Sequence, residues 1–165
     1  MFNPCSICGA SCCKTYTITT TSFDILGLCQ HTGKRPEEFA VLHEACLLSY
    51  DPDLVLELTD SPRGRLLGLK SHPCFFLGSD NRCKAYNKAP LSCRMYPFTL
   101  SGGMNARFCP LLPKAMFRLK GPAMPKELVL KELEDYKEIV KEWNRKPGKE
   151  KECIPFLMKR SKESF

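Results

Sequence analysis

Cysteine is the residue type in this chain with the clearest capacity for chemistry. Eleven cysteines occur among 165 residues, and eight of them have ligand-like spacing: Cys5, Cys8, Cys12, Cys13, Cys74, Cys83, Cys93 and Cys109. Two cysteines separated by two residues can hold one ion across a tight turn, as in zinc sites, and iron–sulfur proteins use similar spacings. Zinc and iron both accept sites made only of thiolates. The pattern therefore predicts metal binding without selecting the metal.

The grouping of these cysteines has several solutions. Neighbouring side chains such as Cys12 and Cys13 point in different directions, so both rarely bind one ion without strain. They could serve two neighbouring metals, or one could bind while the other stays free. Eight thiolates divide into two four-cysteine sites, and a single 4Fe–4S cluster with four cysteines left over is the alternative. We favour the iron–sulfur cluster over zinc, because surplus thiols beside a four-cysteine site suit the redox or assembly chemistry of iron.

The elements that must position the cysteines are short in the first two thirds of the chain. A β-branched run predicts a strand over 15–20, and a capping box at 21–24 predicts a helix that stops before Gly33. A second helix is expected to begin at Pro36. Two hairpins are predicted, one from the runs 54–58 and 65–69, the other from 74–77 and 82–86. The second hairpin would bring Cys74 and Cys83 together from its two arms.

The last third of the chain changes character. From 125 to 144 it is charged and lacks glycine, and one apolar stripe steps by four and three residues: Val129, Leu133, Tyr136, Val140 and Trp143. This period predicts a long amphipathic helix, which we expect to cover the cysteine-rich half. The predicted fold is α+β, a single small domain organised around the cysteine cluster. We expect residues 1–145 to form this domain and residues 146–165 to form a loose basic tail, pinned by Ile154, Phe156 and Leu157.

Composition excludes several classes of protein. The net charge is +7, but eight thiolates holding two Zn²⁺ would lower it to about +3, so the basic excess does not by itself predict nucleic-acid binding. No apolar run is long enough to span a membrane, and the start has no signal-peptide character. We therefore expect a cytoplasmic protein with an unidentified protein partner or substrate, no membrane association and no nucleic-acid partner.

Side chains near the cysteines have two interpretations each. Arg94 could donate hydrogen bonds to thiolates, or it could form a surface ion pair. Tyr96 and Phe98 are expected to be core aromatics, and His72 an exposed loop histidine. Cys29, on the apolar face of its helix, and Cys46, in an apolar stretch, are expected to be small buried hydrophobic residues.

The motifs together resemble a known family. They are the Cys5–Cys13 knot, the 20–26 segment with Asp24, the Cys74 and Cys83 pair, Tyr86, Pro90, the Cys93-Arg94-x-Tyr96-Pro97-Phe98 box and Cys109. The chain resembles the YkgJ-type cysteine-cluster family, which is described as zinc- or iron-chelating, from residue 5 to about 110. The resemblance implies that the eight cysteines are ligands. One departure is Ala89 before Pro90, where the family usually carries arginine. Flagellin lysine-N-methylases look related, which makes methyl transfer a hypothesis by analogy.

Three functional classes are compatible with this pattern. The first is a metal- or cluster-binding module with a redox, carrier or structural role. The second is a protein-modifying enzyme, similar to lysine-N-methylases and assisted by the cluster. The third is a zinc-stabilised interaction module. The sequence lacks a glycine-rich dinucleotide or phosphate-binding fingerprint, so it leaves the question of an enzyme open and assigns no catalytic residue.

Overall fold

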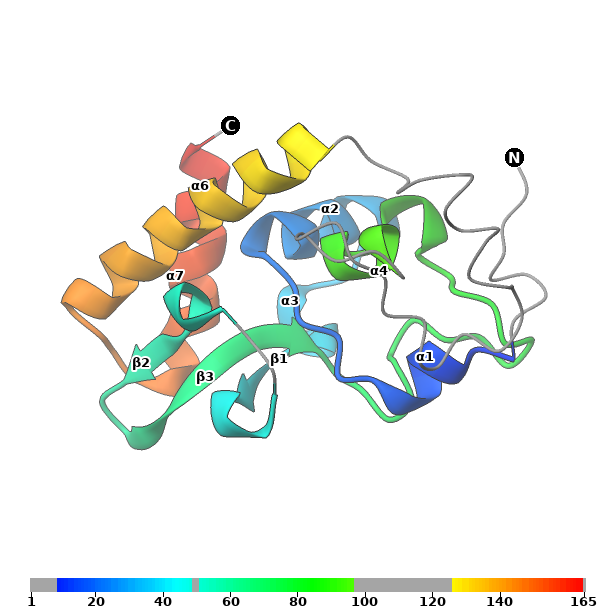
Figure 1. The fold of residues 1–165 in the computed structure, drawn as a ribbon, viewed down its shortest axis with the longest axis horizontal. Helices are drawn as coiled ribbons and strands as arrows, with labels where there is room; N and C mark the ends of the chain where they lie inside the picture. The colour runs from blue at the N-terminus through cyan, green and yellow to red at the C-terminus, as the bar shows by residue number, and fades with distance from the viewer. Residues whose placement is uncertain (1–8, 49–50, 97–125, 165) are drawn as a thin grey trace.

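The computed structural model describes residues 9–48, 51–96 and 126–164 (Figure 1). Helices and a three-stranded sheet make up the chain, which confirms the predicted α+β class. The helices are α1 (Ser11–Thr15), α2 (Ser22–Thr32), α3 (Pro36–Phe39), α4 (Leu91–Met95), α6 (Lys126–Arg145) and α7 (Glu150–Glu163), with single 3-10 turns at η2 (Ala45–Leu47), η3 (Pro52–Leu54) and η4 (Tyr86–Lys88). No helix within these described ranges is both long enough and apolar enough to cross a membrane.

The sheet is antiparallel, with the strand order β1-β3-β2. Its strands are β1 (Ala40–Glu44), β2 (Leu56–Leu58) and β3 (Ser61–Leu69). The β2–β3 hairpin confirms the first predicted hairpin, with a shorter turn because β3 already begins at Ser61. The sequence pattern does not predict β1. The helix that begins at Pro36 ends at Phe39, and the chain then enters β1, where Leu42 lies opposite Leu67 of β3.

The expected strand over 15–20 is an extended segment that touches β3 at one isolated bridge, between Thr19 and Gly68. The Thr20 amide donates to the Leu67 carbonyl at 2.9 Å, and the Leu69 amide donates to the Ile18 carbonyl at 2.9 Å. A Cβ atom at position 68 would lie only 2.6 Å from the Ile18 oxygen, so glycine permits this close approach. The bridge ties the segment after α1 to the sheet.

Helix α2 begins and ends as the sequence predicts. The Thr21 hydroxyl accepts a hydrogen bond from the Asp24 amide, and the Asp24 carboxylate accepts one from the Thr21 amide, which completes the capping box. The helix ends at Gly33, whose φ of 68° lies in the left-handed region that glycine adopts without steric cost. The cap fixes Asp24 at the buried end of the helix.

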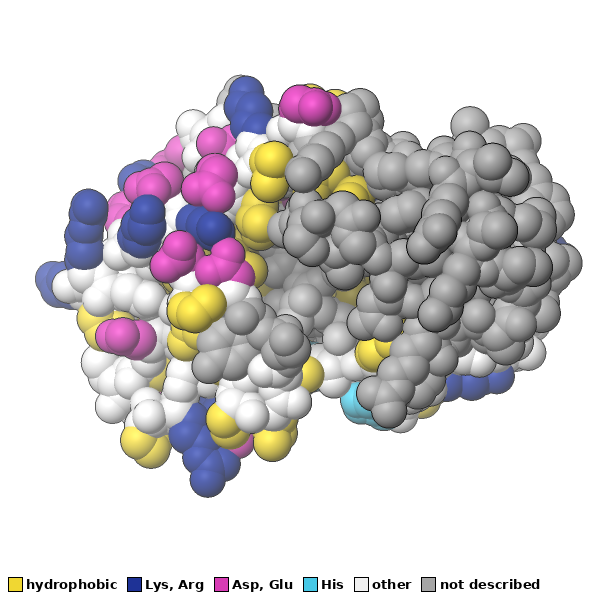
Figure 2. Space-filling model, in the orientation of Figure 1, with side chains coloured by type: hydrophobic (Ala, Val, Ile, Leu, Met, Phe, Trp, Pro, Cys, Tyr) yellow, Lys and Arg dark blue, Asp and Glu magenta, His cyan; other side chains and the backbone are white. Residues whose placement is uncertain are grey.

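The long amphipathic helix is present as α6, and all five side chains of its predicted apolar stripe are buried. Its outer face carries interspersed lysine, aspartate and glutamate side chains (Figure 2). Its C-terminal end covers the exposed edge of β2: Trp143 Nε1 donates to the Glu57 carbonyl at 2.7 Å, and Asn144 bonds the backbone of both Glu57 and Val55. These bonds pair groups that an edge strand otherwise leaves open.

One expectation about the C-terminal third is wrong. Residues 150–163 form the helix α7 and do not form a loose tail, since Cys153, Leu157 and Ser161 are fully buried against α2 and α6. Of the three expected anchors, Leu157 lies in the core, and Ile154 and Phe156 pack at its edge. Among the described residues, helix α6 packs mainly on α7, η3 and β2, and Val129 in its first turns packs against Leu91 and Met95 of α4.

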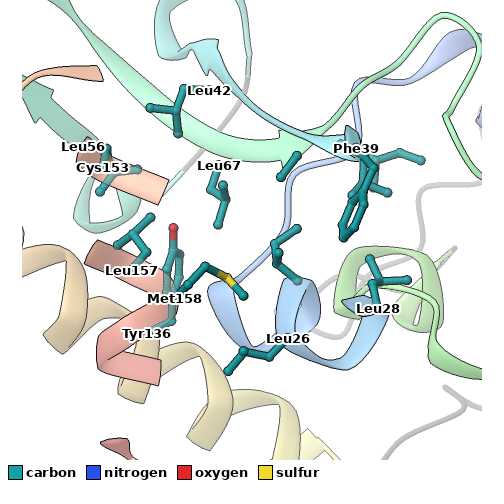
Figure 3. Close-up of a cluster of buried hydrophobic side chains, with 14 of the residues drawn as sticks. Leu26, Leu28, Phe39, Leu42, Leu56, Leu67, Tyr136, Cys153, Leu157 and Met158 are labelled. Atoms are coloured by element: carbon teal, nitrogen blue, oxygen red, sulfur yellow. The ribbon is translucent and has the colours of Figure 1, made fainter. Parts of the chain in front are cut away.

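The main core lies between the sheet and the helices α2, α6 and α7. In Figure 3, Leu26 of α2, Tyr136 of α6 and Leu157 and Met158 of α7 face Leu42 and Leu67 of the sheet. The core continues past Phe39, whose ring centroid lies 5.0 Å from that of Phe76, into the segment that carries Cys74. The cysteine-bearing segments are therefore packed on an ordinary apolar core.

Candidate metal centre

Five of the eight predicted ligands lie in three described segments, and a backbone hydrogen bond joins two of these segments. Cys12 and Cys13 are on the single-turn helix α1, Cys74 and Cys83 lie in the turn-rich stretch between β3 and α4, and Cys93 is on α4. The Cys74 amide donates to the Cys13 carbonyl at 2.8 Å, which joins the first two of these segments directly. Cys5, Cys8 and Cys109 lie outside the described residues.

The second predicted hairpin is reduced to a compact turn. Its arms meet at one bridge between Leu77 and Cys83, supported by bonds from Gly78 to Arg82 at 2.8 Å and from Lys84 to Phe76 at 2.9 Å. Asn81 has a φ of 58°, a left-handed conformation that asparagine adopts more readily than most residues. The turn places Cys83 close enough to Cys74 for the Cys83 thiolate to raise the pKa of Cys74, as the predicted hairpin required.

The five thiols influence one another across all three segments. Burial is the largest cause that raises the pKa of Cys74 and of Cys83, and the neighbouring thiols, Cys12 among them, raise both further. Cys93 keeps an exposed surface on α4, yet desolvation of its sulfur, followed by the thiols of Cys74, Cys12 and Cys83, raises its pKa above its ordinary value. Several thiolates in one partly desolvated region repel each other, and a cation at that place would relieve the repulsion.

Cys12 and Cys13 behave differently from the rest. Their side chains are hydrogen-bonded to each other, although neighbouring side chains are expected to point apart. This bond lowers the pKa of Cys12 to about 6 against the opposing effect of burial, and it raises the pKa of Cys13 well above its ordinary value. One thiol of this pair therefore ionises well before the other, and an ionised thiolate is the form that binds metal.

The described cysteines do not form a finished ligand set. Among the described residues, no three histidine, cysteine, aspartate or glutamate side chains are grouped closely enough to hold an ion. The chemistry of the donors nevertheless fits zinc or an iron cluster, because all five are thiols in mutual electrostatic contact. The grouping of all eight cysteines into one or two sites stays a prediction.

The other described cysteines lie apart from this region. Cys153 is fully buried in the core, where its pKa is raised to about 12, first by burial. Cys29 is half-buried at the edge of the core, close to the expectation of a buried hydrophobic residue. Cys46 is exposed, so the expectation that it is buried is wrong. The reason is that its apolar neighbourhood in sequence ends in η2 at the surface, where Leu47 is also exposed.

A buried carboxylate next to the centre is the feature that the cysteine pattern does not reveal. The Asp24 side chain is only 1% exposed, and its Oδ1 accepts a hydrogen bond from the Leu91 amide at the start of α4, at 2.9 Å. Arg94 Nη2 lies 3.4 Å from Asp24 Oδ1 and 3.8 Å from Glu132 Oε2 on α6. Burial, then Glu132, raises the pKa of Asp24 to about 7. Of the two interpretations of Arg94, the ion pair is therefore the one observed, although its main partner is buried.

Sequence reasoning finds only part of this network. The capping box and the family resemblance both single out Asp24, but nothing in the sequence singles out Glu132, because it resembles every other acid on the outer face of α6. His72 is exposed, as expected, and its Nε2 lies 3.2 Å from the Thr17 hydroxyl. Tyr96 is half-buried and stacks edge-on against Tyr16, with ring centroids 6.1 Å apart, and Phe98 lies outside the described residues.

The comparison with protein families gives one match. A family model described as "CxxCxxCC: Putative zinc- or iron-chelating domain" matches residues 4–110. The chain belongs to this family. The matched region of the zinc- or iron-chelating domain contains all eight predicted ligands together with Asp24 and Arg94, and it ends before α6. Comparison with curated proteins and comparison with solved structures each gave no match.

Proposed function

We propose that this protein binds a metal centre through thiolates drawn from Cys5, Cys8, Cys12, Cys13, Cys74, Cys83, Cys93 and Cys109, and that the centre is a 4Fe–4S cluster held by four of them, with the other thiols beside it. Its role would be redox, carrier or structural. The proposal starts from membership of a zinc- or iron-chelating family and adds the ligands and the identity of the centre. We infer a cytoplasmic location, because a reducing compartment keeps free thiols available for metal.

The observation that carries the proposal is the electrostatic contact among five thiols from three separate segments. Cys93 alone is influenced by Cys74, Cys12 and Cys83, which lie 10 to 81 residues away in sequence. Without a metal, the thiols of Cys74, Cys83 and Cys93 stay largely protonated, because burial and the neighbouring thiols both oppose their ionisation. Metal binding would displace these protons and replace the repulsion with attraction, so that the binding free energy would also stabilise the fold.

An iron–sulfur cluster is preferred to zinc because of the number of thiols. One zinc ion and one 4Fe–4S cluster each take four cysteine ligands, and five thiols already interact among the described residues alone. The surplus thiols suit the redox or assembly chemistry of an iron cluster. Zinc is the second candidate, since the family description names both metals. When bound, the cluster would supply one-electron redox chemistry, and the cysteine side chains would hold its iron atoms.

No specific observation favours an enzyme that modifies proteins. Two surface hollows of about 410 and 500 Å³ occur in the described part of the chain, and both are lined mainly by polar and charged side chains of α6 and its neighbours, away from the cysteines. Ligand pockets are usually more apolar than this. The proposal is therefore limited to metal binding.

Purification under anaerobic conditions tests the proposal directly. The absorption spectrum, iron, zinc and acid-labile sulfide should be measured on one sample. A brown protein with iron and sulfide in equal amounts is the expected result. A colourless protein with one or two zinc ions per chain would replace the cluster with zinc. A protein free of metal that also takes up neither Zn²⁺ nor a reconstituted cluster would refute metal binding.

A further inference from the structure

The helix that carries Cys93 depends on other elements for its position. Helix α4 has only five residues, too few for a helix to be stable by itself. Its first residue, Leu91, donates its amide to Asp24, and the Ser92 hydroxyl donates to the Thr19 carbonyl at 2.8 Å. The position of the Cys93 sulfur therefore depends on the elements that hold Asp24 and Thr19 in place.

Helix α6 contacts this small helix in two chemically different ways. Val129, which is fully buried, packs against Leu91 and Met95 of α4 as a small separate core. Glu132 lies one turn further along α6, so the two side chains project from the same face. Its Oε2 lies 3.8 Å from Arg94, the residue directly after Cys93. The first turns of α6, yellow in Figure 1, thus contact α4, the helix that carries Cys93.

Glu132 also joins the start of α2 to this arrangement. Its Oε1 accepts a hydrogen bond from the Thr21 hydroxyl at 2.8 Å, and Thr21 is the capping residue that holds Asp24. Arg94 therefore lies between two carboxylates, one from α2 and one from α6. Since the matched family region ends at residue 110, the α6 side of this network lies outside that region.

We infer that Glu132 is a positioning residue for the metal centre: through Arg94 it holds α4 so that the Cys93 sulfur faces the other thiols. This inference rests on the proposed function. It means that a helix beyond the family domain tunes the metal affinity of that domain. Groups that position metal ligands are typically worth 10- to 100-fold in affinity, so we expect an effect at the lower end of that range.

The test uses the full-length protein and Zn²⁺ as the probe, with affinity measured by competition against a chromophoric chelator. Glu132→Gln removes the charge that faces Arg94 and keeps an oxygen that accepts from Thr21. Glu134→Gln is the matched control, because it makes the same charge change on the same helix at a side chain that is 62% exposed. Glu132→Gln should weaken Zn²⁺ binding about 10-fold, and the control should change it less than about twofold.

Two further measurements separate positioning from a general loss of stability. The absorption spectrum of the Co²⁺-loaded protein reports the number of thiolates bound, and Glu132→Gln should weaken its sulfur-to-metal bands. In an Arg94→Gln background, Glu132→Gln should have no further effect on Zn²⁺ affinity, because the two residues act as one unit. If Glu132→Gln is not recovered folded, Glu132→Asp, which keeps the charge but shortens the side chain, should give an intermediate loss of affinity.

The outcomes distinguish this inference from the proposed function. If the unmodified protein takes up neither Zn²⁺, nor Co²⁺, nor a reconstituted cluster, the proposed function fails and the inference fails with it. If the unmodified protein binds both ions and Glu132→Gln binds them equally well with an unchanged Co²⁺ spectrum, only the inference is overturned. A loss of affinity that persists in the Arg94→Gln background would also overturn it, since Glu132 would then not act through Arg94.

Discussion

Replacing Asp24 with asparagine tests the buried carboxylate that joins α2, α4 and α6. Burial is the largest cause that raises the pKa of Asp24 from 3.8 to about 7, and the nearby Glu132 raises it further. Hydrogen bonds from the Thr21 and Leu91 amides and the charge of Arg94 oppose this change without reversing it. The folded chain therefore holds the Asp24 carboxylate where its ionised form is unfavourable, while its hydrogen bonds with the Thr21 and Leu91 amides join α2 to α4.

The consequence is a defined dependence of stability on pH. The unfolded chain loses the Asp24 proton near pH 3.8, and the folded chain keeps it until about pH 7. The folded state binds more protons between these values, so the free energy of unfolding falls as the pH rises through this window. At about 1.4 kcal/mol per pH unit the difference corresponds to roughly 4 kcal/mol, of which roughly 2.5 kcal/mol falls between pH 5 and pH 8.

Urea denaturation of the two proteins at four pH values from 5 to 8 measures this effect. Asp24→Asn removes the ionisable group and keeps an oxygen for one of the two backbone amides that Asp24 accepts from, so any loss of the other bond is a constant offset at every pH. Its stability relative to the unmodified protein should therefore rise by roughly 2.5 kcal/mol from pH 5 to pH 8. Asp135→Asn, at an exposed position on α6, controls for the loss of one surface charge. Parallel pH curves for Asp24→Asn and the unmodified protein would refute the reasoning and show that Arg94 outweighs burial.

The remaining predictions concern the ligands and the core. The Cys93→Ser protein should hold less metal and melt at a lower temperature than the unmodified protein, whereas the Cys46→Ser protein, changed at an exposed position, should keep its metal content. Equal metal contents in the two variants would contradict the ligand assignment. Leu157→Ala should cost about 2–5 kcal/mol in the free energy of unfolding, against less than about 0.5 kcal/mol for exposed Lys159→Ala on the same helix; similar small losses would mean that α7 is not part of the core. Tyr136→Phe should be nearly neutral or stabilising in thermal unfolding, because the buried Tyr136 hydroxyl has no hydrogen-bond partner among the described residues; a loss of more than about 1 kcal/mol would reveal a partner.

Some features follow from the sequence because their causes are local. The Thr21–Asp24 capping box and Gly33 bound α2 through backbone groups within a few residues, and both ends are where the sequence predicts them. The apolar stripe of α6 is a periodic signal over twenty residues, and every member of it is buried. A short polar turn joins β2 to β3. These elements needed no information about distant contacts.

Other features depend on contacts between distant residues. Strand β1 exists because it pairs with β3, and the short α3 before it carries a stronger local signal than the strand itself. The charged sequence over 146–165 predicts a tail, but α7 forms because Leu157 and Cys153 find a core made by α2 and α6. Cys46 has apolar neighbours in sequence and is expected to be buried, but it lies in η2 at the surface, where Leu47 is also exposed. Burial is a property of the assembled chain, so local composition predicts it poorly.

For the candidate site, the sequence by itself predicts the donors and determines the thiol chemistry that they offer. The number of cysteines, their spacing and the motif around Cys93 identify a zinc- or iron-chelating family without reference to the structure. Only the tertiary structure decided which groups surround them. Asp24 and Glu132 are 108 residues apart in sequence and meet at Arg94 because α2, α4 and α6 pack together. The physical reason is that ligand chemistry belongs to residue types, whereas desolvation and charge proximity belong to positions in space.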